Sequence, residues 1–244
     1  ELLAASTCVV YGIALCSLLR LAGRSGGAPA ATAALWAEPT GRLIGALALV
    51  LGIAVTVYSG RYLALDQRYE YYYPLLLLLS AGKVGMLLAY DLFTLYLFTA
   101  LTSGSAYVLV AFRRQTQTAI EAGFKYAIMG GMATVLVLAG LGHFYRETGE
   151  LALQLPGVAL GPWGLAGIGM MLFGYAAKAA IVPAHTWLPD AHGRAPSSVS
   201  ALLSGVVIEV SLYALLKVGL RLGVPMQQLG WGLVVAGLAN MTLG

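Results

Sequence analysis

Long apolar runs recur along this chain, and they restrict its fold more than any other feature. A helix needs roughly 20 apolar residues to cross the hydrocarbon core of a bilayer. No water is available there for free backbone groups, so such runs are expected to cross as helices. Approximately this length is found in eight runs, at residues 2–22, 41–60, 74–90, 92–112, 119–145, 164–183, 197–220 and 229–244. We therefore predict an all-α polytopic membrane protein, a transmembrane helix bundle in a single domain.

The composition also favours a membrane protein. Hydrophobic residues make up 59% of the 244 residues and charged residues only 10%, whereas soluble domains carry about 25% charged residues. The 31 glycines fit close helix packing, because small residues let transmembrane backbones approach each other. The net charge of +4 is spread over short connections. This charge forms no basic tract, which argues against nucleic acid as a partner.

One of the apolar runs carries a lysine, followed shortly by a proline. An ionised side chain at membrane depth is costly unless it is paired or hydrated, so Lys178 is interpreted as functional. Pro183 has no N–H and clashes with the carbonyl of Ala179, four residues earlier. We therefore predict a discontinuous helix, interrupted between about Ala179 and His185. Such a break is tolerated where it is buried in protein or lines a water-filled cavity, which suggests a route for protons or ions.

The segment after this lysine resembles a known family. KAAIVPAHTWLPDAHGRAPSSVSALLSG is similar to the signature of the antiporter-like subunits of respiratory complex I, group 4 membrane-bound hydrogenases and multisubunit cation/proton antiporters. The similarity runs from about residue 41 to residue 220, with YSGRYL at 58–63, DLFTLYLF at 91–98 and FKYAIMGG at 124–131. Family members are longer. The resemblance therefore implies a fragment of an antiporter-like fold, truncated at both ends, in a bacterial-type inner or plasma membrane or an equivalent energy-converting membrane.

The resemblance implies a role for Lys178 and reveals two departures from the family. Lys178 stands where the family has the central lysine of its broken helix, which implies a proton-carrying group. The alternative is a structural lysine that reaches the interface. The family usually has lysine or histidine where this chain has Glu209, and an acid where it has Ala100. One hypothesis is that the acid has moved from position 100 to position 209, so that Glu209 faces Lys178. A second is that Glu209 forms a fixed ion pair that only holds helices together, and a third is that this protein no longer pumps.

Three further residues are candidates for proton translocation. Lys83 lies mid-run where the family is normally apolar, so it needs a partner or water. The resemblance places Lys125 on the side where protons enter, although a surface pair with Glu121, one turn earlier, would explain it equally well. His185 could relay protons as a neutral imidazole. Lys217, close to the end of its helix, is expected at the membrane interface.

The other residues of HTWLPDAH and its flanks are interpreted as structural. Their fixed spacing favours a hydrogen-bonded re-entry and helix cap after the break over a metal site. The residues given this structural role are Pro183, Trp187, Pro189, Asp190, His192 and Pro196. The two cysteines, Cys8 and Cys16, lie in one apolar run and fit no metal spacing. We predict no metal site.

No cofactor motif is visible either. The stretch GPWGLAGIGMMLFG is rich in glycine but apolar, so it is read as a packing surface. The sequence has no CxxC pair and no nucleophile elbow. We therefore expect no cofactor and no catalytic residue in this chain, and assign any redox chemistry to partner subunits.

The resemblance implies translocation of protons, or of a cation such as Na⁺, across the membrane. The chain would be an antiporter-like subunit of a redox-driven complex, such as NADH:quinone oxidoreductase or a membrane-bound hydrogenase. Two alternatives stay open: a subunit of a multisubunit cation/proton antiporter, and a non-pumping structural subunit of a membrane arm. The expected partners are other membrane subunits and the lipid bilayer.

Overall fold

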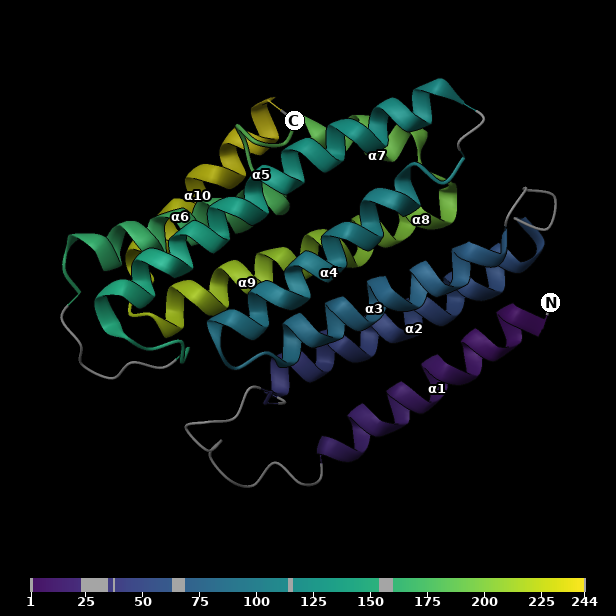
Figure 1. Ribbon diagram of the computed structural model, residues 1–244, viewed down its shortest axis with the longest axis horizontal. Coiled ribbons are helices and arrows are strands. Elements are labelled where there is room, and N and C mark those ends of the chain that lie inside the picture. Colours follow the sequence, from purple (N-terminus) through teal and green to yellow (C-terminus); the bar gives the residue numbers. More distant parts are fainter. Residues whose placement is uncertain are drawn as a thin grey trace.

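Long helices run side by side along the molecule (Figure 1). The computed structural model describes residues 2–22, 35–36, 38–62, 69–113, 116–153 and 160–243. The helices are α1 (Leu2–Ala22), α2 (Pro39–Tyr62), α3 (Tyr72–Leu88), α4 (Leu92–Val110), α5 (Gln117–Thr148), α6 (Pro162–Lys178), α7 (Trp187–Arg194), α8 (Ser197–Leu202), α9 (Ile208–Arg221) and α10 (Met226–Leu243). Within these residues, β-structure is limited to isolated bridges. The predicted all-α class is confirmed.

Several of these helices have the length and composition of membrane spans. Among the described residues, five segments are long and apolar enough to cross a bilayer: Leu2–Leu21, Pro39–Gly60, Leu92–Val110, Gln117–Thr148 and Ser197–Arg221. Helix α3 is equally apolar in character but shorter. This architecture confirms the predicted polytopic helix bundle.

The helix that carries Lys178 is interrupted, as predicted, but it ends earlier than the run 164–183 suggested. Its last helical residue is Lys178, and the next helix begins at Trp187. The amide of Ala180 donates to Ala177 and that of Ile181 donates to Ala176, while Ala180 has a left-handed φ of 54°. This is the hydrogen-bond pattern of a Schellman motif, which satisfies the last carbonyls of a helix. The motif therefore stops α6 before Pro183 is reached.

The helix after the break was expected as one run, 197–220, and it is continuous but irregular. Between α8 and α9, residues Leu203–Val207 form a short π-helical turn. Such turns inside α-helices are frequent at functional sites. Here the turn places Val207 at the wall of the cavity that also contains Lys178.

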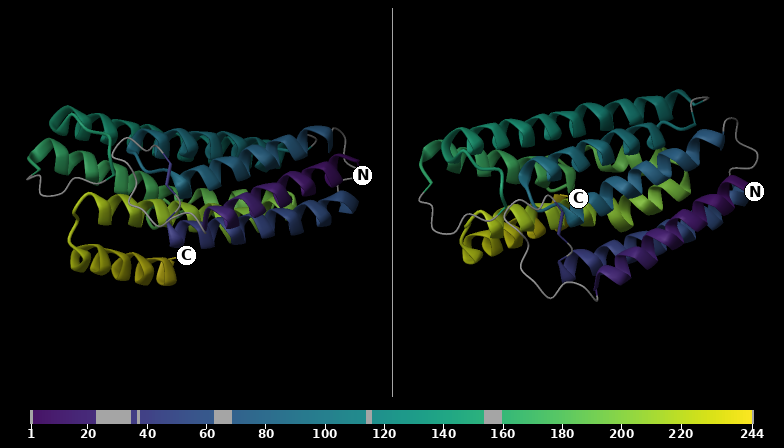
Figure 2. Two further views of the ribbon diagram at one scale, coloured as in Figure 1. Left: turned by 90° about the horizontal axis from the view of Figure 1, so that it is seen from below. Right: turned by 60° about the horizontal axis from the view of Figure 1, so that its bottom comes forward.

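The helices are arranged in three groups across the bundle. Figure 1 shows α1, α2 and α3 on one side, α4 and α9 in the middle, and α5, α6 and α10 on the other side. Figure 2 shows α10 at the edge of the bundle, beside α9. Helices α5 and α6 approach closely at two glycines, because a Cβ on Gly140 would lie 2.5 Å from the carbonyl oxygen of Gly167. Nearer its end, α6 approaches the α5 backbone again at Gly174, where a Cβ would lie 2.8 Å from the carbonyl oxygen of Ala133.

Candidate functional site

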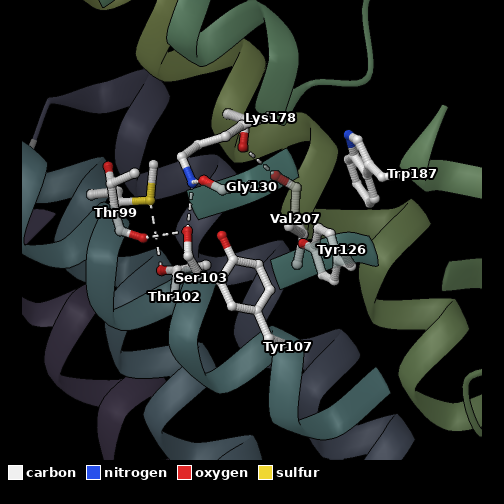
Figure 3. Close-up of a pocket in the computed structure, with 11 residues that line it drawn as sticks. Thr99, Thr102, Ser103, Tyr107, Tyr126, Gly130, Lys178, Trp187 and Val207 are labelled. Atoms are coloured by element: carbon white, nitrogen blue, oxygen red, sulfur yellow. Dashed lines mark hydrogen bonds between the residues drawn. The ribbon is translucent and has the colours of Figure 1, made fainter. Parts of the chain in front are cut away.

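Lys178 is buried at the end of α6, with only 8% of the residue exposed. Its Nζ donates to the hydroxyl oxygen of Ser103 on α4, at 2.6 Å, and to the carbonyl oxygen of Gly130 on α5, at 3.2 Å (Figure 3). Both acceptors are neutral. The lysine, at the end of α6, is thus held by two other helices, and no carboxylate of the described residues forms an ion pair with it.

A small cavity adjoins this lysine. Its volume is about 20 Å³, and a single buried water needs roughly 10–15 Å³ of such space. Most of the polar lining comes from α4: Thr99, Thr102, Ser103 and Tyr107. The hydroxyl of Tyr107 is buried and makes no hydrogen bond to the described residues, and Figure 3 shows it beside Ser103. The cavity is therefore lined in part by hydroxyl groups and is large enough for about one water molecule.

The segment after the break is attached to α6 and α5 by specific contacts. Trp187 is 3% exposed; its indole N–H donates to the carbonyl of Ala177 at 3.0 Å, and its ring stacks on Tyr126 with centroids 4.4 Å apart. Lys125 lies 2.9 Å from Asp190 on α7 and 2.9 Å from Glu121. Trp187 and Asp190 thus join α7 to α6 and α5, whereas the N-cap residue of α7, Thr186, makes no side-chain capping hydrogen bond.

The remaining residues of the motif lie around the turn into α8. The Nδ1 atom of His192 lies 2.7 Å from the hydroxyl of Ser200. Pro196 precedes α8 with an extended backbone, and Pro189 lies within α7. Pro183 follows a cis peptide bond in the break itself.

Lys178 and Glu209, predicted to face each other directly or through water, do not form the direct pair. Glu209 is exposed on α9, and within the described residues no ion pair joins it to Lys178. Its neighbours Val210 and Ser211 are buried. Because successive helical residues are about 100° apart, Glu209 points away from the interior. The α4 residue that contacts Lys178 is Ser103, one turn after the position where the family has its acid.

Two other lysines are buried in the bundle. Lys83 on α3 has no exposed surface, and its Nζ has no hydrogen-bond partner among the described residues. Lys217, which we expected at the interface, is buried on α9. It donates to the carbonyls of Leu87 and Ala89, at 3.2 Å and 2.5 Å. Lys217 thus satisfies carbonyl groups at the end of α3.

Of the five residues predicted to carry protons, the structure places only Lys178 at the cavity. The side chain of Lys125 is 49% exposed in its contact with Asp190. His185 lies in the break with its Nδ1 buried and without a partner in the described residues. Lys83 is buried in α3, and Glu209 is exposed on α9. The structure does not bring these residues into one contiguous relay.

Several polar residues that make specific contacts in the structure were not singled out from the sequence. Ser103 was not singled out, although Thr99, Thr102, Ser103 and Tyr107 recur at helical spacing, which could have indicated a polar face. The acid Glu38 was also missed. It pairs with Arg221 and accepts a hydrogen bond of 2.9 Å from the Tyr213 hydroxyl. No periodic signal marks such an acid just before a helix.

Comparison with known proteins identifies the family. The family model described as "NADH:quinone oxidoreductase/Mrp antiporter, TM" matches residues 89–243, more than half of the chain. The chain belongs to this family. It is therefore a multi-pass protein of an energy-converting membrane.

Two curated relatives show what this chain is similar to. It is 36% identical over 179 residues to NADH-quinone oxidoreductase subunit N of Desulforudis audaxviator, covering 70% of this chain and 35% of the relative. It is 32% identical over 161 residues to F(420)H(2) dehydrogenase subunit N of Methanosarcina mazei, covering 64% of this chain and 33% of the relative. The chain thus spans less than half the length of these relatives.

Solved structures show the same fold. A chain of the membrane-bound sulfane sulfur reductase, an archaeal respiratory membrane complex, is 26% identical with a TM-score of 0.78; the match covers 87% of this chain and 46% of that chain. A chain of respiratory complex I from Thermus thermophilus is 26% identical with a TM-score of 0.73, covering 88% and 47%. A chain of the Mrp complex from Dietzia sp. shares the fold, with a TM-score of 0.78 at 22% identity, covering 91% and 44%.

Proposed function

We propose that this chain is part of a proton-translocating membrane subunit, and that Lys178 takes up and releases the proton. The observation that carries the proposal is the environment of Lys178: a buried ammonium at a helix break, held by neutral oxygens beside a cavity for about one water. Ionisable residues at membrane depth mark proton relays and ion pathways by default. Membership of the family points the same way.

The hydrogen bonds of Lys178 leave room for proton transfer. An ammonium has three N–H donors, and two of them are used by Ser103 and Gly130. The third donor is available to a water in the cavity. A hydroxyl can both donate and accept, so Ser103 and Tyr107, whose hydroxyl has no partner among the described residues, can pass a proton onward from that water. A carboxylate contact would instead fix the charge on the lysine.

The chemistry of Lys178 favours protons over Na⁺ as the transported ion. Oxygen ligands bind hard cations, whereas a protonated lysine has no acceptor and repels a cation. Lys178 can therefore exchange a proton but cannot coordinate Na⁺. Lys125 and His185 are the candidates for uptake or release steps. Lys83, which has no acceptor among the described residues, and Glu209, which is exposed, are expected not to be required.

Other membrane subunits are the proposed partners, and a redox-driven complex is the proposed setting. Support comes from relatives named as subunits of NADH-quinone oxidoreductase and F(420)H(2) dehydrogenase. Likeness to a sulfane sulfur reductase complex and to complex I adds to it. A cation/proton antiporter complex is the alternative setting.

A second candidate function is a structural subunit that does not pump. Two observations favour it: alanine stands at position 100, where the family has an acid, and within the described residues no ion pair joins Glu209 to Lys178. In that case Lys178 would contribute to assembly alone.

Proton uptake into proteoliposomes that contain the assembled complex separates the two functions. Uptake is normalised to the electron-transfer or antiport rate, and Lys178→Ala and Lys178→Arg are compared with the parent. We expect both variants to lose uptake, because alanine cannot carry a proton and arginine does not release one at accessible pH. The amount of assembled complex in each preparation is the control. An unchanged ratio in both variants would leave the structural function as the better account.

A further inference from the structure

The break after Lys178 frees backbone groups that the chain must satisfy elsewhere. The Schellman motif satisfies carbonyls of Ala176 and Ala177. The carbonyl of Ala180 and the amide of Val182 lie beyond that motif. Buried backbone groups without a partner are costly, and more so where no water is available.

A side chain from α10 satisfies both of these groups. The Oδ1 atom of Asn240 accepts a hydrogen bond of 2.8 Å from the amide of Val182. Its Nδ2 atom donates to the carbonyl of Ala180 at 3.4 Å. Only one orientation of the amide group puts an acceptor on the N–H and a donor on the carbonyl, so the contact is specific. Asn240 is 58 residues from Val182 in the chain.

Helix α10 is otherwise weakly embedded. It contains no buried residue, and Figure 2 shows it at the edge of the bundle. Residues near Asn240 face outward, with Leu238 at 59% and Met241 at 84% exposure. The two hydrogen bonds of Asn240 therefore form a polar connection between an outer helix and the break.

We propose that Asn240 is a positioning residue for proton transfer, through which α10 fixes the course of the break beside Lys178. Ala180 lies two residues after Lys178 and has a left-handed φ of 54°, a conformation that L-residues avoid without support. By holding Ala180 and Val182, Asn240 fixes the direction in which α6 ends. That direction sets whether the Lys178 side chain reaches Ser103. A displacement of α10 is transmitted to the break by the same contact. This inference rests on the proposed function of Lys178.

The test compares Asn240→Leu and Asn240→Ala, which remove both hydrogen bonds, with Asn240→Gln, which keeps both groups on a longer side chain. Thr242→Ala is the matched control, because the hydroxyl of Thr242 bonds only to carbonyls of its own helix, at Leu238 and Ala239. Two quantities are measured on the assembled complex. The first is amide hydrogen exchange over residues 179–186; the second is proton uptake per turnover in proteoliposomes.

We expect the leucine and alanine variants to speed exchange over residues 179–186 at least about fivefold, since each lost hydrogen bond contributes of the order of 1 kcal/mol. Proton uptake per turnover falls in parallel, with Asn240→Gln between these variants and the parent. The threonine variant leaves both quantities unchanged. Unchanged exchange in both Asn240→Leu and Asn240→Ala overturns the role of the contact. Faster exchange with unchanged uptake per turnover would show that Asn240 only stabilises the break, and would overturn its positioning role.

The exchange measurement keeps this inference separate from the proposed function. Unchanged uptake in Lys178→Ala refutes proton transfer by Lys178 itself. In that event, hydrogen exchange in the Asn240 variants still shows whether α10 holds the break. The positioning role of Asn240 in proton transfer is refuted as well, because Lys178 then transfers no proton.

Discussion

Of the buried lysines in this bundle, Lys178 and Lys83 differ most in their surroundings. Lys178 ends a helix, donates to Ser103 and Gly130, and adjoins a cavity of about 20 Å³. Lys83 lies inside the unbroken helix α3, has no exposed surface and has no hydrogen-bond partner in the described part of the chain. Lys178 therefore has two acceptors and an adjoining cavity, whereas Lys83 has no acceptor among the described residues.

The difference shows what a helix break contributes. A lysine inside a continuous helix can still reach a carbonyl at the end of a neighbouring helix, as Lys217 does, but Lys83 has no such acceptor among the described residues. At the break, the end of α6 allows Lys178 to lie against the α5 backbone, and the segment that follows closes the site with Trp187. Burial alone therefore does not identify a proton carrier; a carrier also needs partners that can exchange a proton with it.

The largest expected effect follows from removing the side chain that holds the break. Trp187 is 3% exposed and contacts both Ala177 and Tyr126. We expect Trp187→Ala to lower the free energy of unfolding by about 3–5 kcal/mol, because truncating a buried tryptophan leaves a cavity. Trp187→Phe, which retains an aromatic ring but not the N–H, should cost much less. Thermal unfolding of the purified protein measures both, and equal stability of Trp187→Ala and the parent would show that the break does not depend on this residue.

Lys83→Met tests the other buried lysine, and this variant is expected to stabilise the protein. Methionine has a similar length without the charge, so it removes the cost of burying an ammonium that has no partner. We expect the free energy of unfolding to rise by about 2.5–3.5 kcal/mol, the cost of a lysine at the centre of a transmembrane helix on insertion scales, while proton uptake is retained. Loss of uptake in this variant would instead place Lys83 on the proton path.

A smaller effect is expected for the acceptor of Lys178. Ser103→Ala removes the hydroxyl that lies 2.6 Å from Nζ and leaves the carbonyl of Gly130 as the acceptor. Hydrogen bonds to charged groups contribute about 1.5–3 kcal/mol. We therefore expect proton uptake per turnover to fall by about tenfold, with Ser105→Ala on the same helix as the control, since its hydroxyl bonds only to the carbonyl of Leu101. Equal uptake in the two variants would argue against transfer through Ser103.

Glu209→Gln should have the smallest effect. Glu209 is exposed and does not pair with Lys178 within the described residues. We expect uptake per turnover within about twofold of the parent, since exposed substitutions usually have small effects. A large loss would revive the idea that Glu209 replaces the acid absent at Ala100, acting through water.

The sequence was sufficient to predict the helical class and the position of the break. Apolar runs report membrane crossing directly, because a bilayer leaves the backbone few alternatives. Pro183 indicated an interruption, and the structure has one between Lys178 and Trp187. What ends α6 was not predictable: Ala180 adopts the left-handed conformation that glycine usually provides at a helix end. Alanine has the highest intrinsic helix propensity, so it is expected inside a helix and not at its end.

The partners of the break could not be predicted because they come from distant helices. Ser103 and Asn240 are 75 and 58 residues away from the groups that they bind, and neither belongs to a motif. The four-residue spacing of Glu209, Tyr213 and Lys217 puts them on one face of α9, but this spacing does not tell which way that face points. In the structure Glu209 is exposed while Lys217 is buried, because the two ends of the helix have different neighbours.

The most direct test of the account compares the two lysines in one assay. Lys178→Met and Lys83→Met are each assembled into the complex, and proton uptake is measured in proteoliposomes relative to turnover. Both variants remove one buried charge and substitute the same side chain, so they differ only in the site. We predict that Lys178→Met abolishes uptake and that Lys83→Met retains it. Retention of uptake in Lys178→Met, with or without loss in Lys83→Met, would contradict the claim that the lysine at the helix break carries the proton.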